Sequence, residues 1–209
     1  MKFTINLRAL KSVVCAAGKE ETRYYLKGVN FEPRVDAIYL CATDGHVLIA
    51  ARHAYAIDET PLEDLPSFLI PTDLVKGLKL NKALDHGTVE FRDGVVFLHY
   101  AGTTVAAPAI DGSFPAWRQV VPETVDGVTA HYDPRLAMRF VDARDALVGK
   151  GDKVGVEIHQ NGMNPALVSF AVAENDIDIF GVIMPIRGSS AVPIYTWAHR
   201  PKAAESKAA

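Results

Sequence analysis

The apolar positions of this chain change repeatedly from helical spacing to strand spacing. The first helical pattern begins behind Asn6, a residue type that favours the N-cap of a helix. Three β-rich runs follow at 23–33, 37–43 and 46–57, with turn residues between them. The pattern predicts a short helix followed by three strands. The apolar positions of the helix are Leu7, Leu10, Val13, Val14 and Ala17.

The same order of elements then recurs twice. Residues 67–71 are predicted as a strand, and Thr72 is predicted to cap a short helix over 72–80. Three strands follow at 88–93, 95–101 and 103–110, and Asp93-Gly94 is a typical hairpin turn. The third occurrence has a strand at 127–133, a helix at 134–148 capped by Asp133 with Pro134 in its first turn, and strands at 153–160, 165–173 and 177–186.

Three strand-helix-three-strand units therefore account for most of the sequence. Consecutive short hairpins with one helix per unit favour antiparallel sheets with the helices on one face, and we predict an α+β fold. The segments 54–66 and 111–127 contain the prolines and acidic residues expected of connectors. The end of the chain, from 199 onward, is predicted to be frayed.

Basic residues gather on the predicted helices, although the formal net charge is −3. They lie three or four residues apart, so each pair shares a helix face away from the apolar stripe. A solvated helix face is the simple interpretation of any one pair. Their recurrence in each unit instead favours a surface that binds DNA phosphates without reading base sequence. The pairs are Arg8 with Lys11, Lys76 with Lys79, and Arg135 with Arg139.

The sequence gives little support for catalysis, and we predict a protein that is not an enzyme. It has no phosphate-binding glycine loop, dinucleotide fingerprint, nucleophile elbow or zinc-protease helix motif. The seven histidines are dispersed, and Cys15 and Cys41 lie in apolar patterns, so neither a metal site nor a cofactor is expected. Asp44 and His46 could form a catalytic pair, a simple turn, or a turn that shapes a binding site.

No apolar run is long enough to cross a bilayer, and the N-terminal residues lack the apolar stretch of a secretion signal. We therefore expect a cytoplasmic protein with no membrane partner.

Four blocks resemble the bacterial DNA polymerase III beta subunit, the DNA sliding clamp, and stand in the order that family has. They are RYYLKGVNFE at 23–32, ATDGHVLIA at 42–50, IDGSFPAWRQVVP at 110–122 and VIMPIR at 182–187. Residues 1–122 resemble the complete middle domain of the clamp. Residues 123–187 resemble half of its third domain, and 188–209 form a C-terminal extension expected to be partly disordered.

The resemblance implies a DNA-clamp fold whose helices line a hole around double-stranded DNA and whose sheets form the outer wall. It also implies an apolar pocket for short peptides of DNA polymerases and other proteins with a clamp-binding motif, and a clamp loader as a further partner. Val47 and Gln119 stand where the family commonly has basic residues. The pocket residues implied by the resemblance are Arg23, Leu26, Thr43, Gly45, His46, Leu48, Pro115, Val120, Val182, Ile183, Met184 and Pro185.

The expected function is thus a sliding clamp that keeps a polymerase on DNA. A ring of twelve units, as in the family, would need four chains of three units, so we expect a homo-oligomer and favour a tetramer. The alternative is a clamp-fold adaptor or inhibitor that binds clamp-binding peptides, or a host clamp, without encircling DNA. In the extension, Ile194, Tyr195 and Trp197 could cover a strand edge, join a subunit contact or fold into the pocket.

Overall fold

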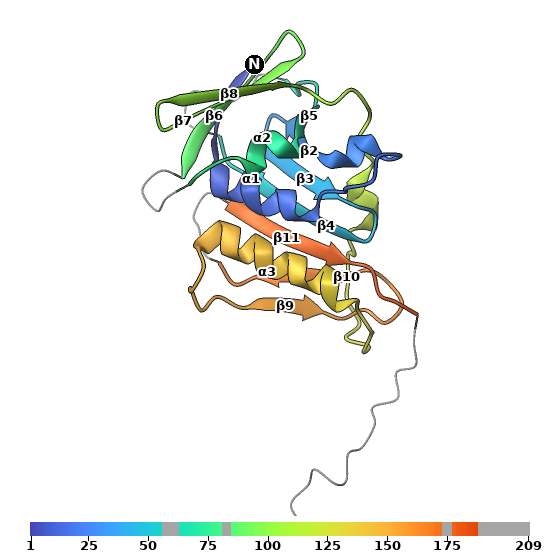
Figure 1. The fold of residues 1–209 in the computed structure, drawn as a ribbon. Helices are drawn as coiled ribbons and strands as arrows, with labels where there is room; N and C mark the ends of the chain where they lie inside the picture. The colour runs from blue at the N-terminus through green and yellow to red at the C-terminus, as the bar shows by residue number, and fades with distance from the viewer. Residues whose placement is uncertain (56–62, 81–84, 173–176, 188–209) are drawn as a thin grey trace, which may run out of the picture.

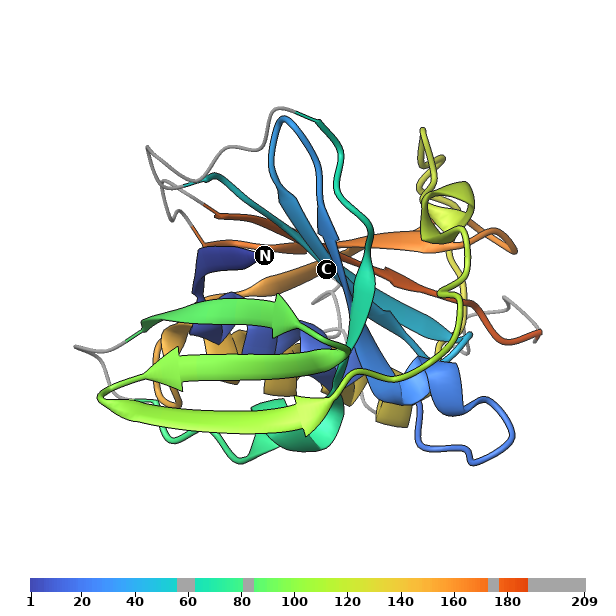
Figure 2. The ribbon, with the colours of Figure 1, turned by 90° about the horizontal axis from the view of Figure 1, so that it is seen from above.

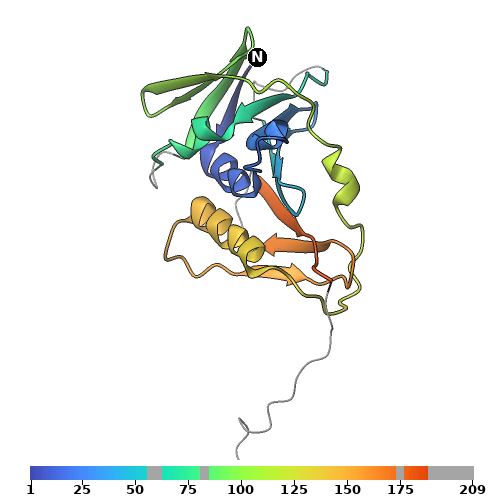
Figure 3. The ribbon, with the colours of Figure 1, turned by 45° about the vertical axis from the view of Figure 1, so that its right-hand side comes forward.

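The structure is a computed structural model that describes residues 1–55, 63–80, 85–172 and 177–187. The predictions for 188–209, including Ile194, Tyr195 and Trp197, lie outside this range. Helices α1 and α3 lie side by side in front of a long sheet, and a second sheet stands above it (Figures 1 and 3). The helices are α1 (Leu7–Val13), α2 (Thr72–Lys76) and α3 (Pro134–Val148), with short 3-10 turns at Val14–Ala16, Tyr24–Lys27 and Trp117–Val120.

Both sheets are antiparallel in every described strand pair, as predicted. The smaller one has the order β1-β6-β7-β8 and the larger one the order β5-β2-β3-β4-β11-β10-β9. Seen from above, the smaller sheet lies nearest the viewer, over the helices, and the larger sheet extends behind it (Figure 2). Their strands are β1 (Lys2–Asn6), β2 (Gly28–Pro33), β3 (Ile38–Thr43), β4 (Val47–His53), β5 (Phe68–Pro71), β6 (His86–Arg92), β7 (Val95–Tyr100), β8 (Thr103–Pro108), β9 (Val156–His159), β10 (Ala166–Phe170) and β11 (Ile177–Ile183).

We use unit 1 for β1, α1 and β2–β4, unit 2 for β5, α2 and β6–β8, and unit 3 for residues 127–133, α3 and β9–β11. Units 1 and 2 exchange their leading strands. Strand β1 pairs with β6 of unit 2, with Asn6 opposite His86, and β5 pairs with β2 of unit 1, with Pro71 opposite Gly28. Each sheet therefore contains a strand from the other unit, which binds the two units into one body.

Units 1 and 3 meet differently, through their last strands. Strand β4 pairs with β11 along its whole length, from Val47 opposite Ile183 to His53 opposite Ile177. Helix α3 packs on this seam, because Gly181 leaves room for the Phe140 ring, which a Cβ at that position would overlap. Phe140 is 1% exposed and belongs to the same hydrophobic core as α1. The larger sheet is thus continuous across both units.

The helix starts follow the capping chemistry in two of the three predicted cases. The Asn6 side chain accepts hydrogen bonds from Arg8 N and Ala9 N, and the Asp133 side chain accepts one from Arg135 N. The prediction that Thr72 caps α2 is wrong, because Pro71 occupies the cap and Thr72 is the first helical residue. There the Thr72 Oγ1 lies 3.2 Å from Lys76 Nζ, one helical turn away.

Two strand predictions are corrected. Residues 24–27 form a 3-10 turn, because β5 begins its pairing with β2 at Gly28 and β3 at Asn30, so neither strand pairs with this segment. Residues 127–133 form no strand and make a single bridge, between His131 and Ile186. Among the described residues, no other unit lies beside β9 to exchange a leading strand with unit 3. The Asp93-Gly94 turn is confirmed, and both residues have positive φ angles, 51° and 75°.

None of the helices in the described ranges is long and apolar enough to cross a membrane.

Candidate nucleic-acid and peptide sites

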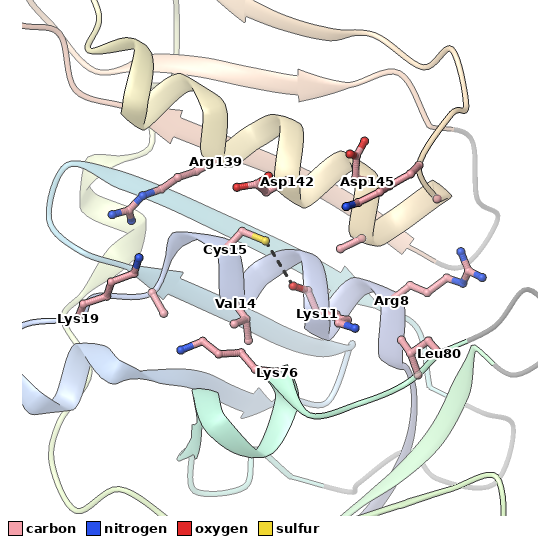
Figure 4. Close-up of a pocket in the computed structure, with 14 residues that line it drawn as sticks. Arg8, Lys11, Val14, Cys15, Lys19, Lys76, Leu80, Arg139, Asp142 and Asp145 are labelled. Atoms are coloured by element: carbon pink, nitrogen blue, oxygen red, sulfur yellow. Dashed lines mark hydrogen bonds between the residues drawn. The ribbon is translucent and has the colours of Figure 1, made fainter.

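A basic groove runs between the three helices, on the face of the larger sheet that they cover. We call it the helix groove; its volume is about 710 Å³. Side chains from α1, α2 and α3 all reach it, as Figure 4 shows for Lys11, Lys76 and Arg139. Two acids, Asp142 and Asp145, also line it. Its basic residues are Arg8, Lys11, Lys19, Lys76, Arg139 and Lys150.

Three of the predicted DNA-contacting residues also hold the units together. The Arg8 guanidinium donates to Leu147 O at the end of α3, at 3.2 Å. Lys11 Nζ donates to Leu78 O just beyond α2, at 2.7 Å. Arg139 forms an ion pair with Asp44 at 2.9 Å, and its side chain is 23% exposed. These cations keep a positive charge in the groove, but their positions are fixed by bonds within the chain.

The groove contains two lysines that the sequence reasoning missed and lacks two residues that it included. Lys79 and Arg135 are exposed but do not line the groove. Lys19 and Lys150 do line it, just beyond Gly18 and Gly149 at the ends of the helical segments. Basic residues are favoured at helix C-termini, so this position was the available signal.

The thiol in the helix groove is not activated. Burial, and secondarily the charge of Asp142, raise the pKa of Cys15 to about 11, and its Sγ lies 3.7 Å from Lys11 O. Burial also raises the pKa of Cys41 well above its ordinary value. Both thiols therefore stay protonated at neutral pH, in line with their prediction as small apolar side chains.

A second, smaller cavity lies beside the β3–β4 turn. We call it the turn pocket; its volume is about 220 Å³. Residues far apart in sequence meet there: the β3–β4 turn, the connector after β8, and the end of β11. The lining residues are Arg23, Tyr25, Leu26, Thr43, Gly45, His46, Val47, Leu48, Pro115, Ala116, Trp117, Val120, Val182 and Met184.

The TDGH segment is a tight turn at the rim of this pocket. Asp44 Oδ1 accepts hydrogen bonds from His46 N at 2.8 Å and Val47 N at 2.9 Å. Thr43 Oγ1 accepts one from Gly45 N at 3.0 Å, and Gly45 has φ 94°. The other Asp44 oxygen pairs with Arg139. The Asp44 carboxylate thus serves the turn and the ion pair, which argues against a catalytic role with His46.

The structure brings together all but two of the predicted pocket residues. Ile183 is 0% exposed and belongs to the main core, because successive residues of β11 face opposite sides of the sheet. Val182 and Met184 therefore face the pocket, and Ile183 does not. Pro185 lies beyond the lining. The additional residues Tyr25, Val47, Ala116 and Trp117 were missed, although Val47 stands inside the turn that the sequence singled out.

The connector wall of the pocket is fixed by a buried carboxylate. Glu32 is 5% exposed and binds Arg118 Nη1 at 3.0 Å. Burial alone would raise the pKa of Glu32, but hydrogen bonds from Arg34 and Arg118 outweigh it, and the pKa is lowered. The Arg118 guanidinium also lies over the Trp117 ring, 4.3 Å from its centroid. The Trp117 side chain is thereby held against the pocket.

Residues 4–116 match the family described as DNA polymerase III beta subunit, central domain. The chain is 29% identical over 124 residues to the beta sliding clamp of Salmonella typhimurium (57% of this chain, 32% of the relative), and 27% identical over 135 residues to that of Escherichia coli K12 (60% and 35%). The chain thus spans about a third of the length of these relatives.

Solved structures match over more of the chain. The DNA polymerase beta subunit of Streptococcus pyogenes has a TM-score of 0.67 at 13% identity, covering 90% of this chain and 66% of that one. The DNA polymerase III beta subunit of Borrelia burgdorferi has a TM-score of 0.66 at 16% identity, covering 90% and 63%. The predicted α+β DNA-clamp fold is therefore confirmed, with helices on one face and antiparallel sheets behind them.

Proposed function

Because this chain belongs to the DNA polymerase III beta subunit family, we propose that it is a non-enzymatic DNA sliding clamp. Several chains would close into a ring around double-stranded DNA and tether a DNA polymerase to it. The observation that carries this proposal is the helix groove, in which basic side chains from all three helices gather on one face of a continuous sheet. A continuous wall with a basic inner face suits a ring that follows the phosphate backbone without reading bases.

The groove argues for weak, mobile contact with DNA. Arg8, Lys11 and Arg139 are already engaged within the chain, so they supply charge from fixed positions. Asp142 and Asp145 reduce the net positive charge of the same surface. Contacts of this kind bind phosphate weakly. A closed ring turns such contacts into long residence, because dissociation then requires the ring to open.

The turn pocket suits a short peptide of a polymerase or another replication protein. Its walls are mainly apolar, and Met184, which is 36% exposed, offers an adaptable side chain to an incoming apolar residue. Val47 takes the place of a basic residue common in the family, so apolar contact matters more here than polar rim contacts. Peptide capture would raise the effective concentration of the polymerase at the template.

We further propose that the ring is a homotetramer, since four chains of three units supply twelve units. Residues 1–122 would form one complete clamp domain, and residues 123–187 half of another. A clamp loader would open the ring for DNA to enter. The residues 188–209 lie outside the described part of the chain and have no role in this proposal.

Retention on DNA of different topology tests the proposal. The protein, with a clamp loader, is placed on nicked circular duplex DNA and separated from free protein by gel filtration at about 0.2 M salt. We expect it to stay on the circle and to leave when one cut linearises the DNA. Equal loss from circular and linear DNA would overturn encirclement and favour the adaptor, which binds clamp-binding peptides without DNA.

A further inference from the structure

Four of the described strands lie at the edge of a sheet: β1 and β5, which are exchanged leading strands, and β8 and β9, which are hairpin strands of two different kinds. Strand β8 is the last strand of unit 2, and β9 is the first hairpin strand of unit 3; each has a described neighbour on one side only. An open edge presents backbone donors and acceptors to another strand. For each of β8 and β9, the corresponding strand of another unit in this chain is paired on both sides. Its partner indicates what kind of strand fits the edge.

The equivalent of the β9 edge is covered by an exchanged leading strand. In units 1 and 2, β2 and β6 are the first hairpin strands, and they pair with β5 and β1 from the opposite unit. The residues one and three before each helix cap are buried there: Ile5 and Phe3 at 0% and 3%, Ile70 and Phe68 at 0% and 6%. In unit 3 no such exchange occurs among the described residues.

The leading segment of unit 3 has the same pattern without the same partner. Tyr132 and Ala130 stand one and three before the cap Asp133, and both are only half-buried. On β9, Val156 and Ile158 face the core side, since they pair with the buried Phe170 and Val168 of β10. The register of units 1 and 2 would set Tyr132 opposite Val156, and Ala130 opposite Ile158, of another unit.

Gly155 marks where the exchanged strand would end. The cap residue Pro71 lies opposite Gly28, one position before the core-facing Val29. By the same register Asp133 would lie opposite Gly155, one position before Val156. A Cβ at Gly155 would meet no atom within 4 Å, so the space beside the backbone is open.

The equivalent of the β8 edge is covered by another last strand. Strand β4, the last of unit 1, pairs antiparallel with β11, the last of unit 3. The side chains of Thr103, Thr104 and Ala106 on β8 are exposed, as expected for an edge that is free to pair. An antiparallel β8 partner from a second copy would reproduce the β4–β11 seam.

We propose that copies of this chain meet like to like, through two different two-fold contacts. Unit 3 exchanges residues 129–133 with unit 3 of a second copy, and β8 pairs with β8 of a third. In a head-to-tail contact, β9 of one copy would pair with β8 of the next. None of the described strand pairs joins the first hairpin strand of a unit to the last strand of a unit. Two-fold contacts use the same patch on both partners, so the copies alternate in direction around an assembly.

This inference rests on the proposed function only for the ring of four; the two contacts themselves follow from the strand pairing. A lysine placed at one contact tests that contact without the other. At the β8 contact the same strand lies on both sides, and like charges facing each other disfavour pairing. Ala106→Lys would break only the β8 contact. Ala130→Lys would break only the unit 3 contact, because its charge would lie opposite the apolar Ile158 of the partner copy. Light scattering should give two-chain particles for each single variant and one-chain particles for the double variant.

Cysteine pairing gives an independent readout in otherwise folded protein. Cys15 and Cys41 are first replaced by alanine. Ala106→Cys alone should then form a disulfide-linked dimer, and a mixture of Ala130→Cys chains with Ile158→Cys chains should form a mixed dimer. A mixture of Ala106→Cys with Ile158→Cys chains should remain unlinked.

The outcomes separate this inference from the ring. Both expected links, with particles larger than two chains but no closed species of four, would uphold the like-to-like contacts and remove the closed ring. A link between Ala106→Cys and Ile158→Cys chains would overturn the inference in favour of head-to-tail contact, even if the ring holds four chains. Absence of all links would overturn it as well.

Discussion

Arg139 on α3 and Asp44 in the β3–β4 turn form an ion pair, with 2.9 Å between Arg139 Nη1 and Asp44 Oδ2. Their side chains are only 23% and 13% exposed. Arg139 lines the helix groove, and Asp44 shapes the turn at the rim of the turn pocket. This one contact therefore joins unit 3 to unit 1 and lies between the two candidate binding surfaces.

Removing the Arg139–Asp44 pair should destabilise the fold more than removing an exposed pair. We expect Arg139→Met and Asp44→Asn to show a coupling free energy of about 1–2 kcal/mol in a double-mutant cycle. Asn at 44 retains the oxygen that accepts the turn hydrogen bonds. The cycle for Lys76→Met and Asp73→Asn, an exposed pair at 3.5 Å, should give a coupling of at most about 0.5 kcal/mol. Urea unfolding measures both cycles, and equal couplings would contradict the structural role.

The groove lysines missed by the sequence reasoning should matter more for DNA than the exposed cations outside it. The double variant Lys19→Gln, Lys150→Gln should show a shallower fall of log affinity with log salt. The magnitude of the slope should decrease by about 2, one phosphate contact for each lysine. The matched control is Lys79→Gln with Arg135→Gln, which removes the same charge. Fluorescence anisotropy with duplex DNA at several salt concentrations compares the variants. An equal loss in the control would show that total charge, not the groove, determines binding.

Met184 should contribute to peptide binding through the turn pocket. Met184→Ala removes an adaptable apolar wall, and we expect about tenfold weaker binding of a labelled peptide that carries a bacterial polymerase clamp-binding motif. The control is Met163→Ala, since Met163 is 60% exposed and does not line the pocket. Unchanged affinity in Met184→Ala would place the peptide elsewhere.

The buried Glu32 carboxylate should make stability depend on acid pH. Its folded-state pKa is lowered, so its contribution is present above the unfolded-state value of about 4.3 and is lost as pH falls through the folded-state pKa. Glu32→Gln should cost about 2 kcal/mol of stability at pH 7, because the hydrogen bonds from Arg34 and Arg118 lose their charged acceptor. The cost should be much smaller at pH 3, where most of that contribution is already lost.

Urea unfolding at both pH values measures this difference. Glu157→Gln is the control, since the Glu157 side chain is 75% exposed. The role of Glu32 would be contradicted if its variant lost the same stability at pH 3 as at pH 7.

Local chemistry made several elements predictable. Asp133 and Pro134 gave the start of α3, and its apolar spacing gave its length, so the helix was predicted residue for residue. Residues 127–133 were mispredicted because a strand needs a partner edge, and β9 of the same unit does not supply it. The alternating apolar pattern was correct, but pairing is decided by what lies beside the segment.

The sequence indicated which residues belong to the two candidate sites, but not which way their side chains face or which residues they contact. The resemblance identified the pocket residues, yet Ile183 points into the core because β11 alternates its faces. The basic residues of the helices were found by spacing, whereas the bonds of Arg8 to Leu147 and of Lys11 to Leu78 span 139 and 67 residues. Contacts over such separations leave no mark on a local sequence pattern.

The central claim is that four copies close into a ring. The absolute mass of the purified full chain, measured by light scattering after size exclusion over a hundredfold range of concentration, tests it most directly. The account predicts a species of four times the chain mass at the higher concentrations. One-chain mass across the whole range, or a two-chain species that never grows, would contradict it.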